Sequence, residues 1–177
     1  MFTQLVIMEL FEKFKKTAEA AGAVVEIISA EKNELTQALN NAIGSAENVV
    51  YAPPVDLPAH IFDEFLKSGK VNAAPSEKEL ETADVGISDA FAAVARTGSI
   101  CLSLDHNSGT VVSLLPKKHI AVLSLSSIVA RPRDVFELQA AKERDFVFIS
   151  GPSATADMGE LVRGAHGPAY LHIILLK

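Results

Sequence analysis

Short apolar runs that alternate with amphipathic stretches limit the folds open to this sequence. The runs 24–28, 48–52, 119–124 and 170–176 are short and rich in β-branched residues, which is typical of buried strands. The stretch between the first two places its apolar residues at helical spacing: Leu35, Ala38, Leu39 and Ala42. Because strands that alternate with helices form parallel crossover units, the sequence predicts an α/β fold with a largely parallel central sheet flanked by helices.

The same reasoning predicts the remaining elements. We expect helices over 7–21, 61–66, 111–115 and 132–142, a short helix after the capping-box pair Ser76 and Glu79, and strands at 83–88 and 146–149. The alanine-rich stretch 91–95 is compatible with either helix or strand. A hairpin around Thr97 and Gly98 is our prediction for this part of the chain.

Length and composition indicate one domain. The chain has 177 residues, of which 49% are hydrophobic and 21% charged, and we assign 1–177 to a single domain. Its functional motifs fall in 83–177, and 1–82 is defined by pattern alone. The net charge of −6 and the absence of Lys/Arg clusters argue against a nucleic-acid partner. No apolar run reaches membrane-spanning length and no secretory signal is visible, so we expect a cytoplasmic protein.

The residue types and their spacing give little indication of a metal site or a redox centre. The single cysteine, Cys101, can form neither an internal disulfide nor a multi-cysteine site, and it lies in an apolar run that suits a buried residue. No His, Asp or Glu pair has the spacing of a metal site. We therefore predict no metal and no cofactor.

The stretch 146–157 suggests a binding site. An apolar strand is followed by Ser150–Ser153, a turn in which Gly151 permits a positive φ, and either Thr155 or Asp157 can cap a following helix. A helix that begins at the carboxyl edge of a sheet directs free N–H groups at anions. An ordinary strand-to-helix turn with no ligand fits the same pattern.

Histidines and hydroxyls supply further candidates. His166 lies in a turn-forming cluster, where it can bind a ligand or shuttle protons, or can bond turn carbonyls in a structural role. His119 opens an apolar strand, so we expect a structural role for it. Ser113, Ser153 and Thr155 offer hydroxyls, but no oriented base is visible beside them, so we assign no catalytic residue.

Several phrases in a fixed order resemble one family. They are Ala95-Arg96-Thr97-Gly98-Ser99, Ser113-Leu114-Leu115-Pro116-Lys117-Lys118-His119-Ile120, Ile149-Ser150-Gly151-Pro152-Ser153, Thr155-Ala156-Asp157 and His166-Gly167-Pro168. Together these phrases are similar to the LutC-like (YkgG) lactate-utilisation family, which carries the LUD domain.

This resemblance implies a NagB/RpiA/CoA-transferase-like fold. It also implies an accessory or regulatory subunit in the oxidation of L-lactate to pyruvate, which binds a small carboxylate or phosphate-bearing ligand. The implied partner is an iron–sulfur subunit, and the lack of a cysteine cluster here agrees with redox cofactors that lie elsewhere. The alternatives are an autonomous enzyme of the CoA-transferase, sugar-phosphate-isomerase or folate cyclo-ligase type, and a degenerate interaction module.

The chain departs from the family pattern at three positions. Arg96 stands where the family usually has Glu, and Ala154 and Thr110 stand where an Arg is common. We expect Arg96 to restore one lost cation if it lies near the turn after Ser153. The complete set of expected ligand-binding residues is Arg96, Thr97, Gly98, Ser113, Gly151, Ser153, Thr155, Asp157 and His166.

Overall fold

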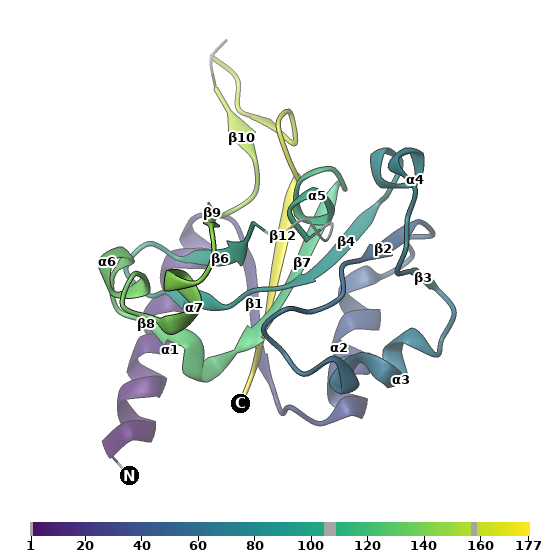
Figure 1. The fold of residues 1–177 in the computed structure, drawn as a ribbon. Coiled ribbons are helices and arrows are strands. Elements are labelled where there is room, and N and C mark those ends of the chain that lie inside the picture. Colours follow the sequence, from purple (N-terminus) through teal and green to yellow (C-terminus); the bar gives the residue numbers. More distant parts are fainter. Residues whose placement is uncertain (1, 105–108, 157–158) are drawn as a thin grey trace.

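A six-stranded parallel sheet forms the centre of the computed structural model, which describes residues 2–104, 109–156 and 159–177 (Figure 1). Its strands, in spatial order, are β1 (Val24–Ile28), β12 (Tyr170–Leu176), β7 (Lys118–Ser124), β4 (Val85–Asp89), β2 (Val49–Tyr51) and β3 (Val71–Asn72). All five neighbouring pairs are parallel. The predicted α/β fold with a parallel sheet is confirmed, and β12, in the run predicted as a buried strand, lies between β1 and β7.

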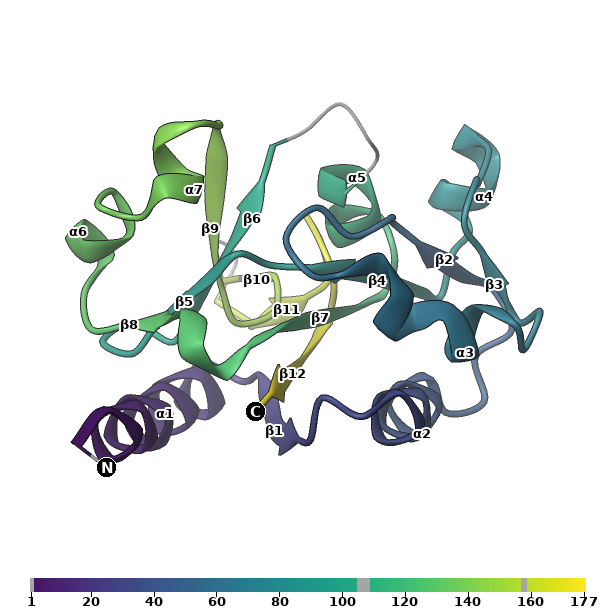
Figure 2. The same cartoon turned by 60° about the horizontal axis from the view of Figure 1, so that its bottom comes forward.

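Helices cover both faces of this sheet because successive strand residues point to opposite sides. Ile174 and Leu176 face α2 (Lys32–Ile43), η1 (Ala59–Phe62) and α3 (Asp63–Leu66), where they join a core with Leu39 and Phe65. Ile173 and Leu175 face α1 (Phe2–Ala20) and join Phe11 and Phe14. Figure 2 shows α1 on one side of the sheet and α2 with α3 on the other. No described helix is long and apolar enough to cross a membrane.

A second sheet packs on the α1 side. Its order is β8 (Ile128–Val129), β5 (Ala92–Val94), β6 (Ser99–Ser103) and β9 (Phe146–Ser150). Strands β5 and β6 are antiparallel, which confirms the predicted hairpin around Thr97 and Gly98. Strand β9 forms where a strand was predicted, pairs with β6 at the edge of this sheet and is only partly buried.

The short helices lie at the ends of strands. They are α4 (Glu77–Glu81), α5 (Gly109–Leu114), η2 (Leu125–Ser127), α6 (Pro132–Val135) and α7 (Gln139–Lys142). Helix α4 begins at the predicted capping box, in which Ser76 and Glu79 bond each other's backbone N–H. The single helix expected over 132–142 is divided into α6 and α7, because Leu138 adopts an extended conformation with ψ 139°.

The segment after β9 differs most from its prediction. Instead of a helix, the described residues form a two-stranded antiparallel ribbon of β10 (Ala154–Thr155) and β11 (Val162–Arg163), which projects from the body in Figure 1. The expected helix start at Thr155 is therefore wrong, and Asp157 lies outside the described residues. Ser153 explains the difference, because its N–H donates to the Pro168 carbonyl at 2.8 Å and its carbonyl accepts from the Gly164 N–H at 3.0 Å. These tertiary bonds hold the backbone extended.

Two glycine turns allow the last turn of α1 to approach the second sheet. Gly98 has φ +66° and Gly151 has φ +69°, which confirms the positive φ predicted for Gly151. A Cβ at Gly98 would lie 2.6 Å from Ala18 Cα, and one at Gly151 would clash with the Ala21 carbonyl oxygen. These two glycines therefore have a packing role in the structure.

Candidate functional site

A cavity of about 250 Å³ lies where α5, the end of β9 and the loop before β12 meet. Its inner walls come from His119 and Leu171, near the first residues of β7 and β12, and from Ser113 of α5. These three residues are almost fully buried, whereas Leu114 and His166 are exposed and mark the mouth. The cavity is thus at the amino end of the central strands, so the carboxyl edge expected for the site was wrong for this cavity.

Four of the expected site residues line this cavity. Ser113 comes from α5, Gly151 and Ser153 from the turn after β9, and His166 from the loop before β12. These segments are far apart in sequence, and the fold brings them together because β9 ends beside the start of β12. Thr155 lies beyond the cavity in β10.

Thr97 and Gly98 lie in the turn against α1 and do not line the cavity. Thr97 is nevertheless connected to it by a chain of hydroxyls. Thr97 Oγ1 is hydrogen-bonded to Ser99 Oγ at 2.7 Å, and Ser99 Oγ to Ser150 Oγ at 2.6 Å. Ser150 lines the cavity, so this chain orients one of its hydroxyls.

The three positions that depart from the family pattern supply no cation to the cavity. Arg96 is exposed in the β5–β6 turn, where its backbone N–H donates to the Ala130 carbonyl at 3.1 Å, and it is not a lining residue. Thr110 contributes its carbonyl to Ser113, and Ala154 is exposed in β10. The compensation expected of Arg96 is therefore not seen at this cavity.

The serine hydroxyls that line the cavity differ in the hydrogen bonds that they can still make. Ser153 Oγ accepts from the His166 backbone N–H at 3.3 Å, which leaves the Ser153 O–H free to donate. Ser113 donates its own O–H to the Thr110 carbonyl at 2.7 Å, so its oxygen remains an acceptor. None of the described lining residues is Asp, Glu, Lys or Arg. Apolar side chains, among them Leu114 and Ile149, form the remaining walls.

His119 is the polar group of the inner end. Its Nε2 is 2.9 Å from Ser88 Oγ, whereas its Nδ1 is buried and has no hydrogen-bond partner among the described residues. Burial lowers the pKa of His119 to about 4, so the ring is neutral at physiological pH. The expectation of a structural role therefore accounts for only one of the two ring nitrogens.

A second polar cluster lies at the carboxyl end of the central strands and was missed by sequence reasoning. Asp89, the last residue of β4, accepts the N–H groups of Val55, Asp56 and Leu57 at 2.9, 2.6 and 2.9 Å. Asp56 in turn pairs with Arg144 at 2.7 Å. Burial and the nearby Asp89 charge raise the pKa of Asp56, and Arg144 opposes that shift. The one sequence feature that could have indicated this cluster is the charged residue Asp89 at the end of an apolar strand.

Asp89→Asn is expected to destabilise the protein by about 2 to 3 kcal/mol, because a carboxylate that accepts three N–H groups is replaced by a neutral amide. Urea denaturation measures the change. Asp63→Asn is the matched control and should cost less than about 1 kcal/mol, because the Asp63 carboxylate forms a half-exposed ion pair with Lys32 at 3.9 Å. Equal losses in the two variants would contradict a structural role for the Asp89 cluster.

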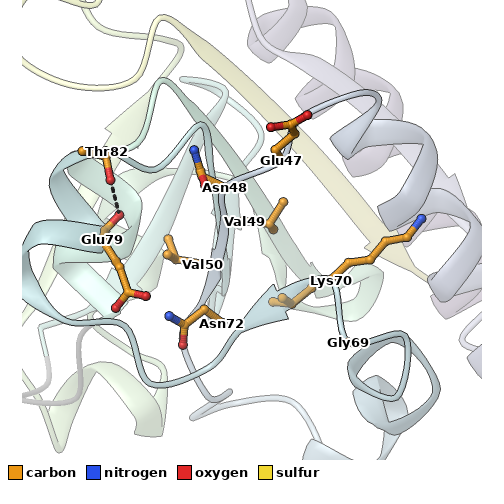
Figure 3. A pocket seen from close by; sticks show the side chains of 10 residues that line it. Glu47, Asn48, Val49, Val50, Gly69, Lys70, Asn72, Glu79 and Thr82 are labelled. Carbon is orange, nitrogen blue, oxygen red and sulfur yellow. Dashed lines mark hydrogen bonds between the residues drawn. The ribbon is translucent and has the colours of Figure 1, made fainter.

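Another cavity, of about 360 Å³, lies at the amino ends of β2 and β3 (Figure 3). Its polar groups already serve local structure. Glu79 completes the capping box of α4, and Asn72 Oδ1 accepts the Ala74 N–H at 3.0 Å. In Figure 3 Lys70 extends away from Glu79, so the two charges do not converge on a ligand position. The cavity beside His119 is therefore the stronger candidate.

Comparisons with known proteins agree with this fold. The protein named Lactate utilization protein C of Deinococcus radiodurans is 32% identical over 174 residues, which cover 95% of this chain and 80% of that protein. The protein of the same name from Oceanobacillus iheyensis is 29% identical over 188 residues, covering 99% and 73%. The crystal structure of a DUF162 family protein from Deinococcus radiodurans has a TM-score of 0.73 at 26% identity and covers 97% of this chain and 98% of its own.

The family model described as the LUD domain matches residues 11–176. This range includes all of the residues that line the cavity, from Ser113 of α5 to Leu171 of β12. The chain therefore belongs to the LUD domain family, whose relatives here are lactate-utilisation proteins.

Proposed function

We propose that this chain is an accessory or regulatory subunit in the oxidation of L-lactate to pyruvate, and that its cavity binds a small carboxylate. One observation carries the binding proposal: Ser113, Ser153 and His166, from three separate segments, converge on one cavity. The names of its relatives support the pathway. Cavities that hold ligands combine apolar walls with a few convergent polar groups, as this one does.

The chemistry of the mouth favours a carboxylate. The Ser153 hydroxyl and the hydroxyl of Ser150 can donate to carboxylate oxygens, and the exposed His166 ring adds a third polar group. The apolar walls accommodate a short alkyl group. A cavity of about 250 Å³ is large enough to hold a short carboxylic acid.

The proposed partner is a subunit that carries iron–sulfur clusters. Cys101 of this chain is fully buried in β6, and burial raises the pKa of its thiol to about 12, so it is a core residue and presents no thiolate at physiological pH. The electron-transfer chemistry of lactate oxidation is then assigned to the partner. Co-purification of the tagged chain from its own cells, with an absorbance spectrum typical of iron–sulfur clusters, would support this arrangement, whereas independent turnover would favour the autonomous enzyme.

A short carboxylate at about 100 times its dissociation constant is expected to raise the Tm by roughly 5 to 10 °C, since such saturation stabilises a protein by about 2.7 kcal/mol. Thermal shift with lactate, pyruvate, propionate and phosphate measures this effect. Ser153→Ala should weaken binding about tenfold, because one donor of the mouth is lost.

Ser126→Ala is the matched control for this prediction. Ser126 is an exposed serine of η2 at the opposite end of β7, and its hydroxyl bonds only Ser124 among the described residues. It should leave the shift unchanged. If phosphate stabilises the protein and no carboxylate does, the cavity binds a phosphate-bearing ligand instead. If nothing produces a shift, the interaction module is the better reading, although an open cavity counts against it.

A further inference from the structure

We propose that two copies of this chain associate through strand β9. The outer edges of the two β9 strands pair antiparallel and join the second sheets of the two copies, of four strands each, into one sheet of eight. Phe148, the middle residue of β9, lies at the centre of this interface. The inference goes beyond the proposed function and requires no ligand, so either can fail without the other.

The edge formed by β9 is the one described sheet edge without protection against pairing. Natural proteins shorten their edge strands or place charges or proline in them, because unpaired backbone groups attract other strands. The edges formed by β3, β8, β10 and β11 have two residues each, and β1 carries the charged Glu26. Strand β9, Phe146–Ser150, has five residues with neither a charge nor a proline. Such an edge is expected to be covered by another strand.

The pairing of β9 with β6 shows which backbone groups face outward. The Leu104 N–H donates to the Asp145 carbonyl at 2.8 Å, and hydrogen-bonded pairs alternate along antiparallel strands. The odd-numbered residues of β9 therefore bond β6, whereas the N–H and carbonyl groups of Phe146, Phe148 and Ser150 point away from it. The 2.6 Å contact of the Ser150 hydroxyl with β6 agrees, because side chains lie closest at the pairs without backbone bonds. No turn or loop hydrogen bond among the described residues uses these outward groups.

The outward groups are complementary to those of a second copy. When two β9 strands lie antiparallel with Phe148 opposite Phe148, Phe146 lies opposite Ser150 and all three outward residues of each copy are paired. A shift of two residues leaves one of them unpaired. Asp145, the charged residue next to the strand, then lies opposite Gly151 and faces no like charge. A two-fold axis at Phe148 produces this arrangement, which is the symmetry of most homodimers.

Exposed aromatic rings beside the edge supply apolar surface for the association. Phe148 is 36% exposed and Phe136 is 56% exposed, with 6.4 Å between their ring centroids. Phe146 lies 5.4 Å from each of them. In the paired strands the two Phe148 residues become cross-strand neighbours with Cα atoms about 5.5 Å apart. Their contact removes aromatic surface from water, which stabilises the pair.

Sedimentation velocity of the purified chain tests the inference. An interface of one strand pair is small, so we expect a dissociation constant on the order of 10 µM. Between about 1 and 100 µM the mass should rise from 18.9 kDa toward twice that value. Phe148→Lys places like charges opposite each other at the axis and should weaken association at least about tenfold. Val24→Lys is the matched control, because Val24 is a 56% exposed residue of the other long edge strand, β1, and it should dimerise as the wild type does.

Disulfide capture tests the register. In Phe148→Cys, oxidation should produce a covalent dimer, because a Cα separation of about 5.5 Å is within the reach of a disulfide. Leu161→Cys is the control, since Leu161 is 63% exposed and lies outside β9, and it should cross-link more slowly. The native Cys101 is fully buried and does not interfere.

Three results would overturn the proposal. The first is a wild-type chain that stays monomeric at 100 µM, in which case the edge of β9 is open to a strand of another protein. The second is a dimer that Phe148→Lys leaves intact or that Val24→Lys disrupts equally. The third is cross-linking of Phe148→Cys that is no faster than that of Leu161→Cys. None of these results bears on whether a carboxylate binds.

Discussion

Replacing Gly98 with alanine is expected to destabilise the protein by about 3 kcal/mol or more, a large part of the stability of a typical domain. Two effects add. Gly98 has φ +66°, a conformation that costs an L-residue roughly 1 to 2 kcal/mol. Its new Cβ would also lie 2.6 Å from Ala18 Cα and from the Thr17 carbonyl carbon. These are backbone atoms, which cannot move away by a side-chain rotation. The last turn of α1 must therefore move away from the second sheet.

Gly69 separates the two effects. It has nearly the same φ, +68°, but no atom lies within 4 Å of a Cβ added there. Gly69→Ala should therefore cost only the backbone term, roughly 1 to 2 kcal/mol. Chemical denaturation of both variants gives the difference, which reports the packing of α1 on the hairpin. Equal costs would show that α1 does not need this close approach.

The displacement of α1 has a further consequence for the cavity. Thr17 Oγ1 donates to the Ala95 carbonyl at 2.8 Å, and Gly98 precedes Ser99, whose hydroxyl bonds Ser150 at the cavity wall. The close contact between α1 and the hairpin therefore also holds the end of β9 in place. Gly98 does not line the cavity itself and is connected to it through these neighbours.

The central sheet was predictable from the sequence because its signals are local. A strand buried on both faces is mostly apolar, as 170–176 and 119–124 are apart from His172, His119 and Ser124. The helices between the strands show their own spacing. Burial follows these patterns closely, since Leu35 and Leu39 of α2 are at most 1% exposed.

The position of β9 could not be predicted because strand pairing is a long-range property. The apolar run 146–149 suits a central parallel strand as well as an edge strand, and its pairing with β6 depends on residues more than forty positions away. The same limit explains the missing helix after Ser153. The local preference for a helix cap is overridden by the hydrogen bonds of Ser153 with Gly164 and Pro168, which the sequence pattern does not reveal.

The candidate site was likewise predictable only in part. Ser113, Ser153 and His166 were identified as polar residues in turn-forming or motif contexts, and the structure places them around one cavity. Arg96 and Thr97 belong to the same family-like phrases but do not line the cavity, since Arg96 is exposed in the β5–β6 turn and the Thr97 hydroxyl bonds Ser99. His119 was assigned to the core because a lone polar residue in an apolar strand usually has all its bonds satisfied.

Acidification from pH 7 to pH 5 is expected to reduce the stability of the wild-type protein by about 2 kcal/mol through His119 alone. The pKa of this residue falls from an ordinary 6.5 to about 4 in the folded protein because its ring is buried. Above pH 6.5 both folded and unfolded states hold it neutral. As the pH falls below 6.5, the imidazole binds a proton in the unfolded state and stays neutral in the folded state. The free energy of unfolding therefore decreases until the pH reaches about 4.

His119→Gln should remove this part of the pH dependence, since glutamine does not titrate. Urea denaturation at pH 7, 6 and 5 measures the free energy of unfolding of each protein. His172 provides a background in the same window, because burial lowers its pKa too, an effect that its 2.8 Å contact with Glu26 opposes. The comparison therefore rests on the difference between wild type and variant, in which the His172 contribution cancels.

His60→Gln is the matched control, because His60 is an exposed histidine of η1 on the other side of the central sheet. It should reproduce the wild-type pH dependence. A flatter curve for His119→Gln alone would establish that the buried ring is neutral in the folded protein. If His119→Gln keeps the full slope, the folded protein accommodates the charged ring, and burial does not depress the pKa of His119 as expected.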